Sequence, residues 1–206
     1  MKRDWNREEK LQFERALQSQ GCQYIAGVDE VGRGPLAGPV VCAAVIMPLD
    51  DASIIEGVDD SKKLSKKKRE QLAEEIKKRA LWYTIVEVDG KKIDEINILQ
   101  ATRLGMKRAI ESLEMLPEMV LTDGNMTLDI ALPQKSVIGG DALCYSIGAA
   151  SIIAKVYRDH LMDEYAKEYP QYGFEKNKGY GTAAHIAGIK EYGLCPIHRR
   201  TFTKKF

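Results

Sequence analysis

Residues 24–39 read Tyr-Ile-Ala-Gly-Val-Asp-Glu-Val-Gly-Arg-Gly-Pro-Leu-Ala-Gly-Pro, and this stretch predicts a strand end followed by a bare loop. Its apolar first part ends at two adjacent acids, Asp29 and Glu30. The glycine-rich second part leads into another apolar run over 40–47, and so short a connection favours an antiparallel pair of strands. The stretch therefore presents two carboxylates beside a backbone that a ligand can approach closely.

Hydrophobic periodicity predicts the other elements of the chain. Apolar residues at three- and four-residue steps predict helices over 7–20, 65–79, 94–113, 142–167 and 182–192. Apolar runs predict strands over 24–30, 40–47, 82–88, 119–122 and 133–138. This order predicts an α/β fold, a mixed five-stranded sheet with helices on both faces and a C-terminal helical extension. We expect one domain over 1–206, with an N-terminal helix within 1–22 and a C-terminal helix and basic tail within 182–206.

The composition argues against a membrane protein and against a disulfide-rich protein. Among 206 residues, 44% are hydrophobic, and no apolar run reaches the ~20 residues that span a bilayer. The charged N-terminus has no signal-peptide core, so we expect a cytoplasmic protein without membrane association. The four cysteines show no zinc-site spacing. Cys195 and His198 could supply two zinc ligands, but four are needed, and reduced thiols are the better interpretation.

Positive charge is concentrated in two segments, although the net charge is only +1. Residues 62–69 read Lys-Lys-Leu-Ser-Lys-Lys-Lys-Arg, and residues 198–205 read His-Arg-Arg-Thr-Phe-Thr-Lys-Lys. Two basic clusters in a nearly neutral protein indicate that a polyanion binds on one face. Each cluster alone is equally consistent with a solvated helix face or a frayed tail.

Acids follow several of the apolar runs and are candidate metal ligands; they are Asp29, Glu30, Asp123 and Asp141. Acids at strand ends of an α/β sheet tend to meet at one edge, where such proteins place their sites. Converging carboxylates repel one another unless a cation neutralises them, and hard oxygen ligands suit Mg²⁺ or Mn²⁺. Two such ions ~3.5–4 Å apart can activate a water and stabilise the leaving oxygen of a phosphodiester.

These acids also have purely structural interpretations. Asp123 precedes a glycine and could belong to a turn, and Asp141 could be the N-cap of the following helix. Asp29 and Glu30 should point to opposite faces of the sheet, because successive strand residues alternate. Both can serve one site only if the strand stops or bulges at Glu30. A dinucleotide-binding motif, suggested by the glycine spacing of 32–37, is rejected because the loop leads into a strand rather than a helix.

Motifs spread from residue 24 to residue 202 resemble those of the ribonuclease HII family. They are 27–39, 60–64, Asp123-Gly124, Gly140-Asp141, 149–155, 178–180 and 198–202. The resemblance implies a single ribonuclease H-like catalytic domain that hydrolyses the RNA strand of RNA–DNA hybrids. It also implies incision 5′ of single ribonucleotides embedded in duplex DNA. Cleavage would proceed by two-metal-ion phosphodiester hydrolysis with Mn²⁺ or Mg²⁺, giving 3′-hydroxyl and 5′-phosphate ends.

The resemblance also assigns roles to individual residues. The family's catalytic acids fall by position on Asp29, Glu30, Asp123 and Asp141. The loop Gly32-Arg33-Gly34 would read the ribose 2′-hydroxyl and neighbouring phosphates, which suits a backbone without side-chain bulk. Tyr180 falls on the family's junction-sensing tyrosine, with a packed core tyrosine as the alternative. Candidate phosphate contacts are Lys62, Lys155, Arg199 and Arg200.

Other functions stay open at this point. A junction resolvase or transposase-type nuclease would share the acids but would not need the glycine loop. A nucleic-acid-binding module with inactive acids would bind duplex with or without metal. A small-molecule phosphohydrolase would not need two basic clusters, and its substrate affinity would depend little on salt. The expected partners are RNA–DNA hybrids and DNA duplexes that contain ribonucleotides, bound by a monomer.

Overall fold

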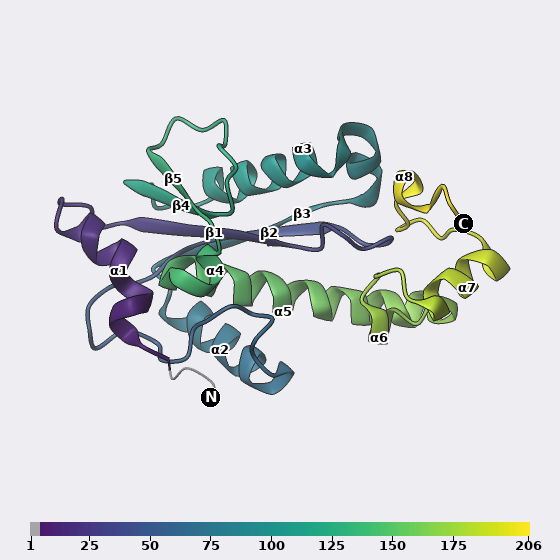
Figure 1. The fold of residues 1–206 in the computed structure, drawn as a ribbon, viewed down its shortest axis with the longest axis horizontal. Helices are drawn as coiled ribbons and strands as arrows, with labels where there is room; N and C mark the ends of the chain where they lie inside the picture. The colour runs from purple at the N-terminus through teal and green to yellow at the C-terminus, as the bar shows by residue number, and fades with distance from the viewer. Residues whose placement is uncertain (1–4) are drawn as a thin grey trace.

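One mixed sheet forms the centre of the molecule, with strand order β3-β2-β1-β4-β5 (Figure 1). The structure is a computed structural model that describes residues 5–206. The strands are β1 (Ile25–Val31), β2 (Val40–Ile46), β3 (Trp82–Val88), β4 (Met119–Asp123) and β5 (Gln134–Val137). β1 pairs antiparallel with β2 and parallel with β4. β3 is antiparallel to β2, and β5 is parallel to β4. The predicted mixed sheet and antiparallel β1–β2 pair are confirmed.

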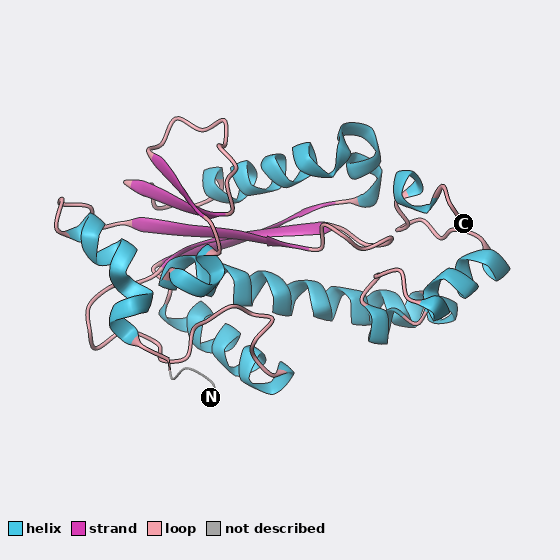
Figure 2. Ribbon diagram, viewed as in Figure 1, coloured by secondary structure: helices cyan, strands magenta, loops and turns pink. Residues whose placement is uncertain are grey.

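Helices cover both faces of this sheet (Figure 2). They are α1 (Arg7–Gln18), α2 (Lys66–Arg79), α3 (Gly90–Glu111), α4 (Gly140–Leu143), α5 (Tyr145–Glu168), α6 (Phe174–Asn177), α7 (Ala183–Tyr192) and α8 (Arg200–Thr203). α3 lies over one face, and α5 with α2 lies over the other (Figure 1). Within residues 5–206, none of the helices has the length and apolar character needed to cross a membrane. Of the expected N-terminal segment, residues 1–4 lie outside the described part.

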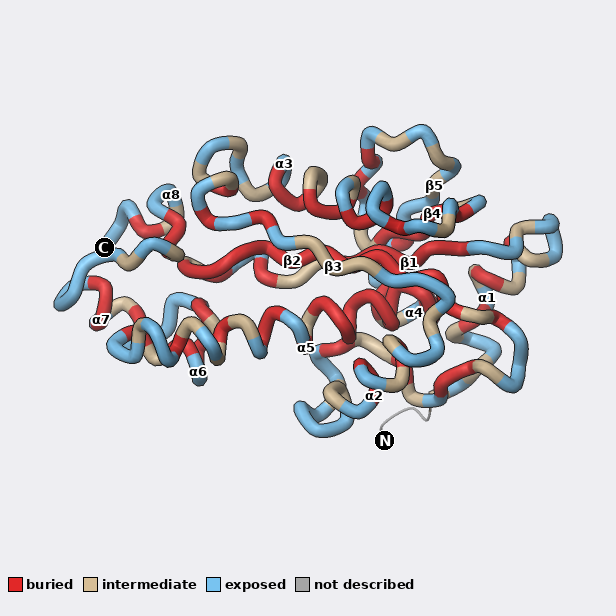
Figure 3. The backbone as a smooth tube through the Cα atoms, turned by 180° about the vertical axis from the view of Figure 1, so that it is seen from behind, coloured by how far each residue is buried: buried red, intermediate tan, exposed pale blue. Residues whose placement is uncertain are grey.

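Strand β2 is buried along its whole length, as its apolar sequence predicts (Figure 3). Its alternate residues supply two separate cores, with Val41 packing toward α5 and Cys42 packing toward α3. β1 follows the same alternation, because Ile25 belongs to the α5 core and Val28 to the α3 core. The position of a side chain in β1 therefore decides which face of the sheet it serves.

The single helix predicted over 142–167 is wrong, because the chain breaks at Cys144 into α4 and α5. Cys144 has extended dihedral angles (φ −125°, ψ 125°), and its side chain does not cap α5. The fully buried Glu14 of α1 supplies that cap, accepting the Ser146 amide at 2.8 Å, the Ser146 hydroxyl and the Cys144 thiol. A carboxylate also suits the positive end of the helix dipole. Helical periodicity cannot show a cap that comes from 130 residues away.

Helix α3 also departs from its predicted bounds of 94–113. It begins earlier, at Gly90, and Asn97 interrupts it with non-helical dihedral angles (φ 65°, ψ 165°). The Asn97 side chain accepts the amides of Leu99 and Gln100, so it restarts the helix as an N-cap would. A single interrupting residue leaves the apolar periodicity on both sides intact, and the sequence pattern therefore did not reveal it.

Replacing Glu14 with alanine should lower the melting temperature of the protein. The change leaves the buried amide and hydroxyl of Ser146 without their acceptor, which costs on the order of 1–3 kcal/mol. In a protein of this size, each kcal/mol lowers the melting temperature by roughly 2–4 °C, measurable by calorimetry. The exposed Gln12 on the same helix provides the control, because Gln12→Ala removes no buried partner. Equal changes in both variants would contradict the capping role.

Candidate active site

Asp29 and Asp123 lie at the end of the central parallel pair of strands. The β1–β4 register pairs Val28 with Thr122, so the next pair in this register is Asp29 with Asp123. The hydrogen-bonded ladder stops before that pair. Both side chains belong to the α5 side of the sheet, because residues in parallel register point to the same face. Asp29 is only 5% exposed, so its carboxylate is almost withdrawn from water.

The Glu30 side chain lies on the opposite face of β1, the face covered by α3. β1 stays paired with β2 through Val31, so the strand neither stops nor bulges at Glu30, and that expectation is wrong. Glu30 is opposite Cys42, which belongs to the α3 core. It can approach the other acids because the ladder to β4 has ended at Thr122. Beyond that point no neighbouring strand on this side separates the two faces, so Asp29 and Glu30 can reach one place around the strand edge.

A tight turn brings Asp141 to the end of β4. The Gly140 amide donates to Asp123 Oδ1 at 2.7 Å, which ties the start of α4 to the strand end. Asp141 follows in the first turn of α4 and is 8% exposed. Gly139, in the left-handed conformation, occupies the N-cap position, so Asp141 is not the cap. The break between α4 and α5 thus keeps Asp141 next to Asp123.

Burial and mutual repulsion both disfavour negative charge on these acids. Burial, followed by the carboxylates of Glu30 and Asp123, raises the pKa of Asp29 well above its usual value. Burial also raises the pKa of Glu30; the Arg33 guanidinium lowers it, and Asp123 raises it further. These interactions show that the side chains from both faces of β1 share one electrostatic environment.

Lys62 reaches this environment from the loop before α2. Its Nζ lies 3.5 Å from Asp141 Oδ2, although 78% of its side chain is exposed. Partial burial opposes its charge, but Asp141, Asp60 and Asp29 raise the pKa of Lys62 above the ordinary lysine value. Burial raises the pKa of Asp141, and Lys62 acts to lower it. A mobile ammonium beside the acids can neutralise them or turn toward a phosphate.

The donor set at this strand end suits a hard divalent cation. In residues 5–206, no three Asp, Glu, His or Cys side chains are gathered closely enough to hold a metal ion. Asp29 and Asp123 each use one carboxylate oxygen to accept a backbone amide, from Glu30 and Gly140 respectively, both at 2.7 Å. Because burial and the neighbouring carboxylates oppose the negative charge of Asp29, a divalent cation with oxygen preference would be favoured here.

The glycine loop after β1 lies against Tyr180. Gly32 has a φ of 91°, which favours glycine, and a Cβ on it would overlap the Arg158 guanidinium. A Cβ on Gly34 would lie 3.6 Å from the Tyr180 ring, so these two residues are neighbours. Tyr180 is 44% exposed, which excludes the alternative of a packed core tyrosine. Loop and ring form one accessible surface that continues from Glu30.

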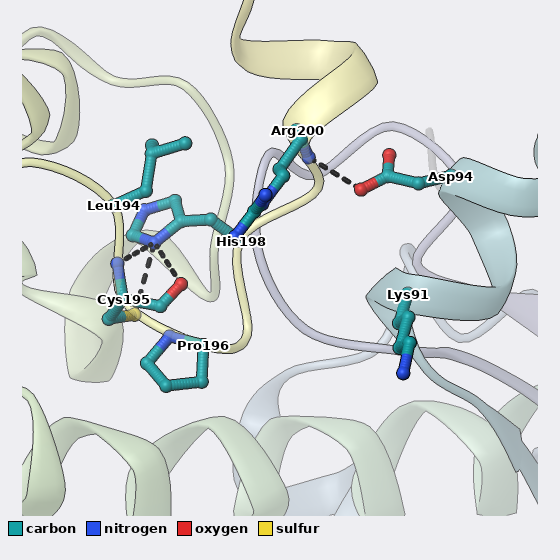
Figure 4. A pocket seen from close by; sticks show the side chains of 7 residues that line it. All are labelled: Lys91, Asp94, Leu194, Cys195, Pro196, His198 and Arg200. Carbon is teal, nitrogen blue, oxygen red and sulfur yellow. Dashed lines mark hydrogen bonds between the residues drawn. The ribbon is translucent and has the colours of Figure 1, made fainter.

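The basic candidates lie in different environments. Arg33 is exposed, and its guanidinium is 3.5 Å from the Glu30 carboxylate. Arg200 is exposed and lines a pocket of 580 Å³ near the C-terminus (Figure 4). Lys155 is half-buried and forms an ion pair with Asp159 at 2.6 Å on the same helix. Arg33 and Arg200 are therefore more available to a phosphate than Lys155.

The expected phosphate contact of Arg199 is wrong. Arg199 is 0% exposed, and its guanidinium donates to the backbone carbonyls of Gly32, Arg33 and Gly38. No phosphate can reach it, and its effect on the site is indirect. A second buried arginine, Arg158 on α5, contacts the same loop and was missed, because helical periodicity gives no reason to expect a charge on a buried helix face.

The C-terminal basic segment is anchored rather than frayed. Asp94 of α3 accepts the backbone amide of Arg200 at 2.7 Å (Figure 4) and that of Thr201 at 2.9 Å. Cys195 and His198 lie in the same pocket, with Sγ and Nδ1 3.0 Å apart.

A mixed sheet with acids at the ends of adjoining strands defines the class as a ribonuclease H-like nuclease. A family model for Ribonuclease HII matches residues 26–205. The chain is 56% identical over 197 residues to ribonuclease HII of Caldicellulosiruptor saccharolyticus, covering 96% of this chain and 95% of that protein. It is 55% identical over 196 residues to ribonuclease HII of Ruminiclostridium cellulolyticum, covering 95% and 76%.

A solved structure gives the same result. The ribonuclease H2 from Pyrococcus horikoshii superposes with a TM-score of 0.74 at 30% identity, covering 88% of this chain and 96% of that one. The chain belongs to the ribonuclease HII family. It is a metal-dependent endoribonuclease that cleaves the RNA strand of RNA–DNA hybrids.

The variant Asp29→Asn should stabilise the metal-free protein. The folded state raises the pKa of Asp29, so the charged carboxylate opposes folding above that raised pKa. Asparagine keeps the shape without the charge, so we expect a melting temperature higher than that of the wild type. Calorimetry in a chelator measures it.

Two controls accompany this measurement. The gain should disappear as the pH falls through the raised pKa toward 3.8, the ordinary value, because both states then bind the proton. Glu114→Gln, at an exposed acid after α3, should leave the melting temperature unchanged. Millimolar Mg²⁺ or Mn²⁺ should raise the melting temperature of the wild type more than that of Asp29→Asn. A less stable Asp29→Asn protein would contradict the repulsion among the acids.

Proposed function

We propose that the chain also incises duplex DNA on the 5′ side of a single embedded ribonucleotide. This proposal rests on one observation: the acids at the end of β1 and the glycine loop follow each other directly in the chain. β1 ends in Asp29 and Glu30, and the loop Gly32-Arg33-Gly34 follows directly, with the Tyr180 ring beside Gly34. Only the 2′-hydroxyl distinguishes RNA from DNA at one nucleotide, so a reader must bring hydrogen-bonding groups to within ~3 Å of it. A loop without side chains next to the acids meets that requirement.

The acids divide the chemical work by their positions. Two divalent ions, Mg²⁺ or Mn²⁺, would supply an activated water and stabilise the leaving oxygen, giving 3′-hydroxyl and 5′-phosphate ends. Asp29, fixed by the Glu30 amide, is the most buried of the four acids and faces the same side as Asp123. Glu30 approaches from the other side of the strand, and Asp141 from α4. The chain thus offers carboxylate oxygens from three directions around one strand end.

The exposed cations offer contacts to the phosphate backbone. Lys62 lies beside the acids, Arg33 lies within the glycine loop, and Arg200 lies on the anchored C-terminal segment. Such contacts position a duplex without reading its sequence. We propose RNA–DNA hybrids and ribonucleotide-containing DNA duplexes as the partners, bound by a monomer in the cytoplasm.

The variant Asp29→Asn should lose activity by ~10³-fold or more, because several kcal/mol of transition-state stabilisation depend on this carboxylate. The assay uses three labelled duplexes: all-DNA, DNA with one ribonucleotide, and an RNA–DNA hybrid, each with and without Mg²⁺ or Mn²⁺. The wild type should cut the second and third only, and only with metal. Activity near wild type in a folded Asp29→Asn protein would overturn the assignment of the acids, and cutting of the all-DNA duplex would favour a junction resolvase.

The variant Tyr180→Ala should lose more activity on a single embedded ribonucleotide than on a continuous hybrid. The ring lies beside the glycine loop, where it could contact one nucleotide, whereas a hybrid offers many ribonucleotides in alternative registers. Tyr180→Phe separates the contribution of the ring from that of the hydroxyl. Tyr192→Ala is the matched control, since Tyr192 is exposed at the end of α7. Equal losses on the two substrates would remove Tyr180 from ribonucleotide recognition.

A further inference from the structure

Two arginines place their charged groups inside the protein beside the glycine loop. Arg158 on α5 is 1% exposed, and Arg199 just before α8 is 0% exposed. Burial lowers the pKa of Arg158 to about 10 and that of Arg199 to about 9, so both stay charged at neutral pH. Each guanidinium uses its donors on backbone carbonyls. Burying two like charges close together costs free energy. The contacts of the two guanidinium groups show which part of the structure they stabilise.

Arg199 connects the two ends of the glycine loop. Its Nε and Nη2 donate to Gly38 O at 2.9 and 2.8 Å. Nη2 also donates to Gly32 O at 2.5 Å, and Nη1 donates to Arg33 O at 2.8 Å. The planar Arg199 guanidinium therefore binds both Gly32, at the start of the loop, and Gly38, near its end. The loop has few side chains that could fix its conformation. The hydrogen bonds from the buried Arg199 guanidinium fix it instead.

Arg158 connects the same loop to the segment that carries Tyr180. Its Nε donates to Pro39 O at 2.9 Å, and Nη2 donates to Ala37 O at 3.1 Å. Its third donor, Nη1, reaches Lys178 O at 2.9 Å. Arg158 is thus shared between two segments that are far apart in sequence. Losing it would leave carbonyls of both segments without a donor at the point where they meet.

The two segments also contact each other directly. Gly179 O accepts the amides of Leu36 at 2.8 Å and Ala37 at 3.3 Å. Gly179 has a φ of 86°, and a Cβ on it would overlap the Ala37 carbonyl oxygen. On the far side, the buried His185 contacts Tyr180 O through Nδ1 at 2.9 Å. The backbone that carries the tyrosine ring is therefore fixed on both sides.

We propose that Arg158 and Arg199 are positioning residues for ribose recognition, holding the glycine loop and the Tyr180 segment as one rigid unit. Neither arginine touches the substrate. The inference rests on the proposed incision at single ribonucleotides. Each arginine acts through the carbonyls it binds, and only a planar fork of several donors can bind them together. Lysine keeps the charge but provides one compact ammonium, so it should not replace either side chain.

The variants Arg158→Lys and Arg199→Lys test this role. We expect kcat/KM on the single-ribonucleotide duplex to fall about tenfold further than on the hybrid, the effect of one lost hydrogen bond in the transition state. A duplex with a single ribonucleotide offers one 2′-hydroxyl, so its recognition depends on the correct conformation of the glycine loop and the Tyr180 segment. A hybrid offers many 2′-hydroxyls and depends less on that conformation. Arg15→Lys is the control, since Arg15 also donates to a backbone carbonyl, Leu49 O, but lies on α1.

A second pair of variants tests the junction without touching the arginines. Gly179→Ala should separate the two segments, because its Cβ would overlap Ala37, and should produce the same selective loss. Gly21→Ala is matched to it, since Gly21 also has a positive φ, 96°, but has no atom within 4 Å of an added Cβ. Circular dichroism and melting curves identify variants that fold. If the lysine variants do not fold, the Gly179→Ala and Gly21→Ala pair decides the question.

The outcomes separate this inference from the proposed function. If the wild type does not cut the single-ribonucleotide duplex, the proposed function fails. If the wild type cuts it, and the folded variants lose activity equally on both substrates or not at all, the positioning role fails. A selective loss in the folded Arg158→Lys and Arg199→Lys variants, or in Gly179→Ala where neither lysine variant folds, with Arg15→Lys and Gly21→Ala unchanged, establishes it.

Discussion

Repulsion among carboxylates gathered at one strand end is the constraint on which the rest of the site depends. The sheet puts Asp29 and Asp123 in register, and the turn into α4 adds Asp141. Without a cation this arrangement disfavours the folded state, because the charges are both buried and close. The surrounding scaffold must therefore hold it firmly. Strand β2 is buried throughout, α5 covers the face that Asp29 serves, and Glu14 fixes the break that positions Asp141.

Most of the fold could be predicted from local patterns. The apolar run over 40–47 indicated a fully buried strand, and the short loop before it indicated an antiparallel pair, as the structure shows. The break at Cys144 and the interruption at Asn97 could not be predicted, because each depends on one residue's dihedral angles within an otherwise helical pattern. Periodicity measures which face is apolar, and it does not register where a helix stops and restarts.

The site was predictable where its chemistry is carried by residue type. Acids after apolar runs and glycines after acids pointed to the strand end and the loop before any contact was known. The route of Glu30 to the site was not predictable, because it depends on where the neighbouring ladder ends. The basic residues differ in how far they are buried, and composition does not predict which of them are exposed. Arg200 is exposed while its neighbour Arg199 is fully enclosed, although the two look equivalent in the sequence.

The bonds of Arg199 have a consequence for biosynthesis. Its partners Gly32, Arg33 and Gly38 precede it by 161 to 167 residues, so they leave the ribosome long before it does. A growing chain can bring its carboxylates together once Asp141 and α5 have emerged, and only later does Arg199, the residue before α8, place its guanidinium against the loop. A nascent polypeptide would acquire its acidic cluster before the neighbouring loop takes its final conformation.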